Sequence, residues 1–169
     1  MSLSVRSATL ADRDAILAIN RAGMPGVSAF EPAELERCIS AATLFWVAER
    51  GGEPCGYLLA FAHGFAGIGD EYAWFSARHA AFLYVDSIAI AERARRSGVG
   101  AALYARLEDE ARRRGIARLS CEVNLEPPNP QSLAFHGARG FREVGRLRVR
   151  DGRFVALLER EIGAGALQK

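Results

Sequence analysis

The sequence lacks the features that mark several large classes of protein. Its three cysteines, Cys38, Cys55 and Cys121, are odd in number, lie far apart and include no C-x-x-C pair, which argues against a disulfide framework. No histidine stands at ligand spacing beside them, so a structural zinc site is not expected. No window reaches the ~18 apolar residues of a membrane span, and the first six residues hold no apolar signal core. A cytoplasmic location is therefore expected.

An excess of charge of one sign is also missing. The 22 Lys and Arg residues oppose 20 Asp and Glu, a net charge of +2, which favours neither a nucleic-acid partner nor a membrane surface. Lysine itself is nearly absent, because 21 of the basic residues are Arg and Lys169 is the single Lys. A chain of 169 residues, half of them hydrophobic, is long enough for one domain with a full core. We expect that domain over residues 1–162 and a flexible tail over 163–169.

Hydrophobic periodicity and turn residues predict strands and helices in the order β-α-α-β-β-β-α-β-α-β-β, an α/β chain. The run over 82–90 is almost wholly apolar, which is typical of a central strand covered on both faces. The amphipathic run over 99–114 predicts a helix that Gly115 ends. Asn129 followed by Pro130 predicts the start of another helix.

Residues 64–81 are irregular and rich in aromatic side chains, among them Tyr72, Trp74 and Phe75. A segment of this length fits a binding loop. A short extra helix whose aromatic side chains fill the core fits the sequence equally well.

One segment has the composition of an anion-binding loop. Residues 95–101, Arg-Arg-Ser-Gly-Val-Gly-Ala, join the apolar strand to a helix N-terminus. Glycines let the backbone turn tightly, and the first turn of a helix offers unpartnered N–H groups to a pyrophosphate. The triphosphate loop G-x-x-x-x-G-K-[ST] is missing, and the dinucleotide fingerprint would need glycine in place of Leu103. The pattern R-x-x-G-x-G, by contrast, matches at Arg95, Gly98 and Gly100.

A second motif follows at a fixed distance: Asn129-x-x-Ser132-x-x-Phe135-His136-x-x-x-Gly-Phe. Together the two motifs resemble the GNAT superfamily of acyl-CoA-dependent N-acyltransferases, and in detail a bacterial subgroup of undefined substrate. The resemblance is close over residues 82–145. It implies a single-domain GNAT fold, a twisted mixed β-sheet with helices on both faces and splayed central strands. It also implies acetyl transfer from acetyl-CoA to a primary amine by direct attack.

The resemblance also implies where acetyl-CoA binds. The backbone of the central strand would pair with the pantetheine arm, the loop and helix N-terminus would hold the pyrophosphate, and the second motif would contact the arm or the phosphates. The residues concerned are Ile88, Ala89, Ile90, Arg95, Arg96, Ser97, Gly98, Val99, Gly100, Ala101, Asn129, Ser132 and Phe135.

Two residues are candidates for catalysis. His136 stands where the family commonly has Tyr, and one hypothesis makes it the proton donor to the departing thiolate. Its alternative is a polar helix residue that hydrogen-bonds the cofactor or the backbone without proton transfer. Asp86 lies within the apolar strand, where a carboxylate needs a partner, so it is either the general base or amine anchor, or a structural carboxylate.

Four residues are candidates for acceptor binding: Glu122 and Asn124 on one face of the next strand, with Tyr72 and Trp74. The expected acceptor is a small-molecule or peptide amine, with no metal, nucleic acid or membrane involved and with a homodimer left open. One alternative function is a GNAT-fold module that binds acyl-CoA without catalysis. A nucleotide-binding oxidoreductase domain is a second alternative, which the loop spacing disfavours.

Overall fold

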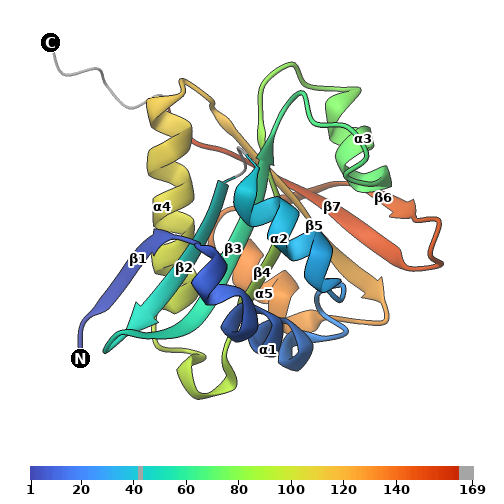
Figure 1. The fold of residues 1–169 in the computed structure, drawn as a ribbon. Helices are drawn as coiled ribbons and strands as arrows, with labels where there is room; N and C mark the ends of the chain where they lie inside the picture. Colours follow the sequence, from blue (N-terminus) through green and yellow to red (C-terminus); the bar gives the residue numbers. More distant parts are fainter. Residues whose placement is uncertain (42–43, 164–169) are drawn as a thin grey trace, which may run out of the picture. The chain divides into compact units, whose positions relative to one another are not determined.

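A computed structural model of the chain describes residues 1–41 and 44–163 (Figure 1). The expected tail, apart from Gly163, lies outside the described residues. The strands and helices follow the predicted order with one extra helix. They are β1 Leu3–Ser7, α1 Arg13–Gly23, α2 Pro32–Ser40, β2 Leu44–Arg50, β3 Glu53–Ala62, α3 Asp70–Ser76, β4 Leu83–Ile90, α4 Val99–Arg113, β5 Arg118–Glu126, α5 Pro130–Ala138, β6 Arg142–Arg148 and β7 Phe154–Glu161.

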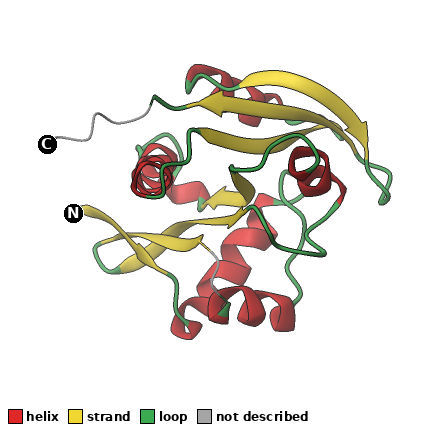
Figure 2. Ribbon diagram, turned by 90° about the horizontal axis from the view of Figure 1, so that it is seen from above, coloured by secondary structure: helices red, strands yellow, loops and turns green. Residues whose placement is uncertain are grey.

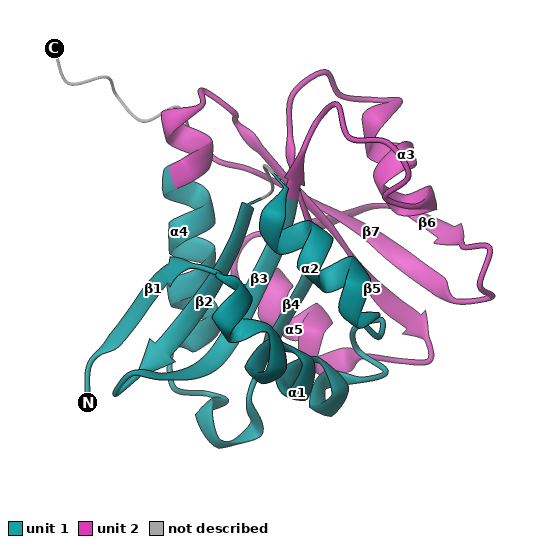
Figure 3. Ribbon diagram, viewed as in Figure 1, with its two compact units in different colours: residues 1–60, 86–109 teal, residues 61–85, 110–169 magenta. Residues whose placement is uncertain are grey.

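The strands form a mixed sheet, as predicted. Their hydrogen-bonded order is β1-β2-β3-β4-β5-β7-β6. β4 and β5 are parallel, whereas β1 with β2, β2 with β3, β5 with β7 and β6 with β7 are antiparallel. By its contacts the chain divides into two compact units, residues 1–60 with 86–109 and residues 61–85 with 110 onward (Figure 3).

The first unit is built on strands β1, β2 and β3. Helices α1 and α2 lie on one side of these strands and α4 lies on the other (Figures 1 and 2). The β2–β3 hairpin turns at Gly51 and Gly52, whose φ angles of 60° and 82° are those that a tight hairpin requires. β3 begins at Glu53, because its pairing with β2 continues past a bulge at Ala48 and Glu49.

The second unit is built on β5, β7 and β6. Helix α3 packs against β5. This helix resolves the ambiguity of residues 64–81 in favour of the short extra helix, because Tyr72 and Phe75 are buried, with 4% and 0% exposure. Their rings pack against those of Phe82 and Tyr84, so these two aromatic side chains of the segment belong to the core.

The ladder between β4 and β5 is short. It pairs Leu83 with Leu119 and ends where Val85 pairs with Cys121. Both strands continue, β4 to Ile90 and β5 to Glu126, and their described residues form no further ladder pairs with each other.

Candidate functional site

The loop between β4 and α4 has the conformation expected of an anion-binding turn. Arg96 has a φ of 57° and Gly98 a φ of 85°, both in the left-handed region. For a residue with a side chain this costs ~1–2 kcal/mol, and strain of this kind is concentrated at functional sites. The first α-helical hydrogen bond of α4 runs from Ala102 N to Gly98 O at 3.0 Å. The preceding N–H groups therefore have no acceptor within the helix.

The loop is fastened to the β2–β3 hairpin of the same unit. Arg50 Nη2 donates to Ser97 O at 3.0 Å, and Arg93 Nη2 donates to Pro54 O at 2.9 Å. Ser97 Oγ donates to Ala94 O at 2.6 Å, which closes the turn from within. The backbone that would face a phosphate is therefore held before any ligand arrives.

The adjoining part of β4 is packed closely against β3 and α4. Gly56 of β3 is the point of closest approach, because a Cβ there would lie 2.9 Å from both Ile90 Cδ1 and Val99 Cγ1. Ala89 is buried with 7% exposure, while Ile88 and Ile90 are half-buried. Gly56 therefore contacts both expected binding elements. One is the strand expected to pair with pantetheine, and the other is the start of the helix expected to hold pyrophosphate.

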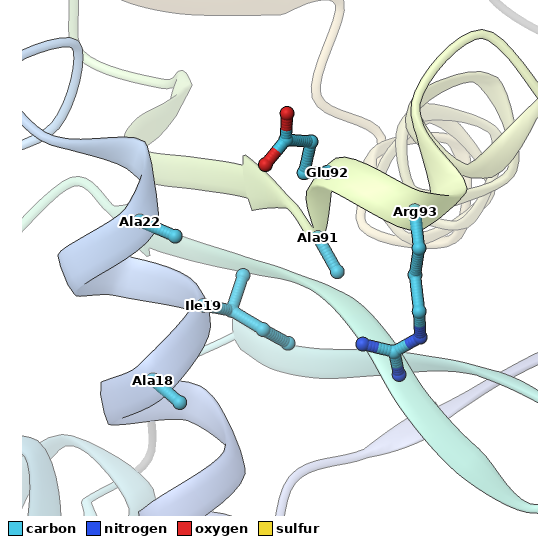
Figure 4. Close-up of a pocket in the computed structure, with 6 residues that line it drawn as sticks. All are labelled: Ala18, Ile19, Ala22, Ala91, Glu92 and Arg93. Carbon is cyan, nitrogen blue, oxygen red and sulfur yellow. The ribbon is translucent and has the colours of Figure 1, made fainter.

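An open pocket of about 480 Å³ borders this loop on the α1 side (Figure 4). Small side chains of α1 point toward the first residues of the loop. The pocket is lined by Ala18, Ile19, Ala22, Ala91, Glu92 and Arg93. This pocket could not be predicted from the sequence, since alanines on an amphipathic helix carry no chemical signal.

Asp86 lies on β4 close to two titratable groups of the first unit, the half-buried Cys38 and the buried Tyr57. Burial raises the pKa of Cys38 to about 11, and the charge of Asp86 adds to that rise. Burial raises the pKa of Tyr57 to about 12, hydrogen bonds from Ser87 and Asn20 oppose the rise, and Asp86 again adds to it. Asp86 itself is half-buried.

His136 lies on α5 of the second unit with 3% exposure. Its Nδ1 is 2.8 Å from the carbonyl oxygen of Ser132, which can only accept, so the Nδ1 proton is directed to that oxygen. The pKa of His136 is lowered by burial, and the charge of Arg139 adds to the effect while the Ser132 bond opposes it. A neutral imidazole whose single proton is committed to the backbone fits the hydrogen-bonding alternative better than proton donation.

The other α5 residues of the second motif are arranged along the start of the helix. Asn129 Oδ1 accepts from Ser132 N at 3.3 Å, so Asn129 is the N-cap that its position predicted. Ser132 Oγ lies 3.2 Å from His136 Nδ1. Phe135 is half-buried, with its ring 5.2 Å from the His136 ring. Their predicted contacts with acetyl-CoA stay predictions.

Glu122 and Asn124 belong to a polar cluster of the second unit. Tyr84 Oη donates to Glu122 Oε2 at 2.5 Å. Arg153 Nη1 donates to Asn124 Oδ1 at 3.1 Å, and its Nη2 lies 3.0 Å from Glu71 Oε1. Sequence reasoning missed Tyr84, Glu71 and Arg153, because each lies in a different element and no spacing connects them.

The two aromatic candidates for acceptor binding have different surroundings. Tyr72 Oη donates to Ala62 O at 2.6 Å and accepts from Phe65 N at 3.1 Å, which are structural bonds. Trp74 is half-buried beneath the guanidinium of Arg78, 3.6 Å from the ring centroid. Trp74 is therefore partly accessible, whereas Tyr72 is part of the core.

Each unit thus brings together one part of the predicted set. The first unit holds Asp86, the strand residues 88–90 and the loop 95–101. The second unit holds the polar cluster of Glu122 and Asn124 and helix α5. Within residues 1–41 and 44–163, no three metal-ligating side chains are grouped as a metal would require. No helix in the same ranges is long and apolar enough to cross a membrane.

Comparisons with known proteins agree with these motifs. The sequence model of the Acetyltransferase (GNAT) family matches residues 14–141. The ribosomal-protein-alanine N-acetyltransferase from Brucella melitensis has 28% identity and a TM-score of 0.70, over 94% of this chain and 99% of that one. The comparison with curated protein sequences gives no match.

Two further solved structures show the same fold at lower identity. The ribosomal-protein-S18-alanine N-acetyltransferase from Escherichia coli has 18% identity and a TM-score of 0.73, with 99% of each chain covered. The putative acetyltransferase yncA from Salmonella typhimurium, solved with its cofactor acetyl-CoA, has 19% identity and a TM-score of 0.72, over 100% of this chain and 99% of that one.

Proposed function

Because the chain belongs to the GNAT acetyltransferase family, with residues 14–141 matched, we propose that it transfers the acetyl group of acetyl-CoA to a primary amine of a small molecule or a peptide. The observation that carries the proposal is the loop after β4. It combines R-x-x-G-x-G, a left-handed Arg96 and Gly98, and the start of α4.

Acetyl-CoA would be held by two features of the first unit. The backbone N–H groups from Arg96 to Ala101 suit the pyrophosphate, because they have no helical acceptor and lie at the positive end of the α4 dipole. The backbone of Ile88, Ala89 and Ile90 suits the amide-rich pantetheine arm, with which it can pair as a strand does. Arg95 is exposed near this loop and adds positive charge.

The reaction forms a C–N bond between the amine and the thioester carbonyl carbon and breaks the C–S bond, so the amine loses a proton and CoA leaves as a thiolate. Two carboxylates are candidates for handling the amine. Glu122 is held by the Tyr84 hydroxyl and suits the binding of an ammonium group. Asp86, half-buried on β4, suits removal of the proton.

His136 is assigned a supporting role in this proposal. Its Nδ1 proton goes to the Ser132 carbonyl, and burial keeps the ring neutral near pH 7. Replacing His136 with Gln should therefore leave kcat within about threefold at saturating acetyl-CoA, whereas loss of a proton donor costs ~10²–10⁴-fold. A loss in that larger range would restore the donor hypothesis.

The test is an acetylation screen with acetyl-CoA and a panel of amines, read by release of the CoA thiol and by mass spectrometry of the product. Because the Brucella relative is a ribosomal-protein-alanine N-acetyltransferase, the panel should include peptides with N-terminal Ala beside polyamines and free amino acids. Transfer to at least one amine is expected. Binding of acetyl-CoA without transfer to any would favour the non-catalytic module.

A further inference from the structure

A buried amide connects the end of α1 to the strand that is expected to bind acetyl-CoA. Asn20 lies in the last turn of α1 with 1% exposure. Its Oδ1 accepts from Phe30 N at 2.9 Å, and because a backbone N–H can only donate, this bond fixes the orientation of the amide. Its Nδ2 then donates both hydrogens, to Ser28 O at 3.0 Å and to Tyr57 Oη at 2.9 Å.

The hydrogen-bonded chain continues from Asn20 to β4. Tyr57 is fully buried on β3, and its hydroxyl oxygen already accepts from Asn20. That hydroxyl also hydrogen-bonds Ser87 Oγ, 2.7 Å away on β4, and either oxygen of this pair can be the donor. Asn20, Tyr57 and Ser87 thus form a continuous hydrogen-bonded chain from α1 through β3 to β4.

This chain fastens an exposed segment to β4. Residues 24–30 join α1 to α2, and most of them are exposed, Met24 by 48%. Asn20 holds the segment through the backbone of Ser28 and Phe30. The Phe30 ring packs against Tyr57, with centroids 5.7 Å apart, so the same tyrosine receives both contacts.

The other end of the segment approaches β4 directly. A Cβ on Gly23 would lie 3.3 Å from Ala89 Cβ and 3.2 Å from Val27 Cγ2, so the helix end, the segment and β4 meet in close packing. Ser87 and Ala89 are the neighbours of Asp86 and Ile88 on the strand. A molecule delivered to that stretch of β4 therefore meets residues 24–30 beside it.

We propose that Asn20 is a positioning residue which, through Tyr57 and Ser87, sets residues 24–30 against β4 as part of the surface that receives the acceptor amine. This inference rests on the proposed acetyl transfer. Asn20 touches neither substrate in this proposal. It acts through the backbone of residues 24–30, which it holds in place. A small displacement of that backbone would weaken acceptor binding and so raise KM for the acceptor.

Two substitutions separate the links of the chain. Asn20→Asp keeps the shape and an acceptor for Phe30 N, but it places a carboxylate oxygen against the Ser28 carbonyl and removes the donor to Tyr57 Oη. Tyr57→Phe removes the link to Ser87 and leaves the amide bonds to Ser28 and Phe30 in place. Ile16→Val, fully buried in the same helix, is the control for lost stability alone.

The first measurement is amide hydrogen exchange of the full chain over residues 24–30, which needs no acceptor. We expect at least about tenfold faster exchange in Asn20→Asp, a smaller change in Tyr57→Phe, and no change confined to this segment in Ile16→Val. Unchanged protection of residues 24–30 in Asn20→Asp would overturn the inference.

The second measurement is steady-state kinetics with the best amine from the screen. We expect KM for the acceptor to rise about tenfold in Asn20→Asp and by less in Tyr57→Phe, while KM for acetyl-CoA stays within about twofold. Equal losses for both substrates, or the same pattern in Ile16→Val, would show a merely structural role and refute the inference. If the unaltered chain acetylates no amine, the proposed function fails. If exchange over residues 24–30 is nevertheless faster in Asn20→Asp, Asn20 holds this segment in place but has no acceptor role, which also refutes the inference.

Discussion

His136 illustrates what a sequence motif fixes and what it leaves open. The motif predicted that this residue lies on a helix, which the structure shows as α5. Its role, however, depends on the direction of the Nδ1 proton. That direction is set by the carbonyl oxygen of Ser132, 2.8 Å away. Asp86 shows the same division: its place on β4 was predictable, whereas its proximity to Tyr57 and Cys38 depends on how β3 and α2 pack.

The buried His136 should make stability depend on pH in a defined direction. Its pKa is lowered in the folded chain, so below the ordinary value of ~6.5 the unfolded chain binds a proton that the folded chain does not. The free energy of unfolding should therefore fall as pH decreases from about 7 to 5, with a limiting contribution of ~1.4 kcal/mol per pH unit. His136→Gln should flatten that dependence in urea unfolding curves. The exposed His63→Gln is the control, and an equal change in both variants would contradict the assignment.

Arg96 and Arg95 offer a matched pair for the strained turn. Arg96 has a φ of 57° and Arg95 a φ of −66° with extended ψ. Glycine relieves the energetic cost of a left-handed φ only at position 96. Arg96→Gly should therefore raise the free energy of unfolding by ~0.5–1 kcal/mol, and Arg95→Gly should lower it by a similar amount. Thermal unfolding of the two variants without ligand measures this difference. Equal losses would mean that Arg96 bears no strain.

At the scale of elements, long patterns were predictable and short ones were not. Helix α4 was expected over 99–114 and spans Val99–Arg113, because a stripe of apolar residues repeats over four turns. Helix α3 has seven residues, too few for a period to stand out among aromatic side chains. The start of β3 at Glu53 depends on a bulge in its pairing with β2, and a bulge leaves no local signature in the sequence.

The contact of β3 with β4 and α4 predicts a specific sensitivity at Gly56. An added Cβ would lie 2.9 Å from Ile90 and Val99 side-chain atoms and 3.2 Å from the Ala89 carbonyl oxygen, and the backbone oxygen cannot move aside alone. We expect Gly56→Ala to lower the free energy of unfolding by ~1–3 kcal/mol. Gly137→Ala, in α5 with open space around it, should instead be neutral or stabilising by up to ~1 kcal/mol. Denaturant unfolding distinguishes the two, and a neutral Gly56→Ala would refute the packing argument.

For the whole molecule, the family could be predicted from two motifs, because R-x-x-G-x-G and the α5 motif each reflect a local backbone requirement. The acceptor could not be predicted in the same way. The polar cluster joins Tyr84 of β4, Glu122 of β5, Glu71 of α3 and Arg153, which precedes β7. Side chains from four parts of the chain meet only through the fold, so no contiguous pattern encodes them.

Ligand binding should stabilise the chain as a whole and discriminate between nucleotides. A ligand that binds only the folded chain adds ~2.7 kcal/mol to the free energy of unfolding at 100 times its Kd. We expect acetyl-CoA to raise the melting temperature progressively with concentration and NAD to leave it unchanged. A shift with NAD alone would favour the oxidoreductase alternative over the acetyltransferase.

The fastening of the loop after β4 has a consequence for the speed of encounter. Arg50, Arg93 and Arg95 donate to the backbone carbonyls of Ser97, Pro54 and Ile90, and within residues 1–41 and 44–163 none of the three forms an ion pair with a carboxylate. A carbonyl holds a guanidinium in place without cancelling its charge, so these three arginines contribute a local positive field although the molecule is nearly neutral. Such a field steers a polyanion toward the loop, and the association rate of CoA should therefore fall steeply as ionic strength rises.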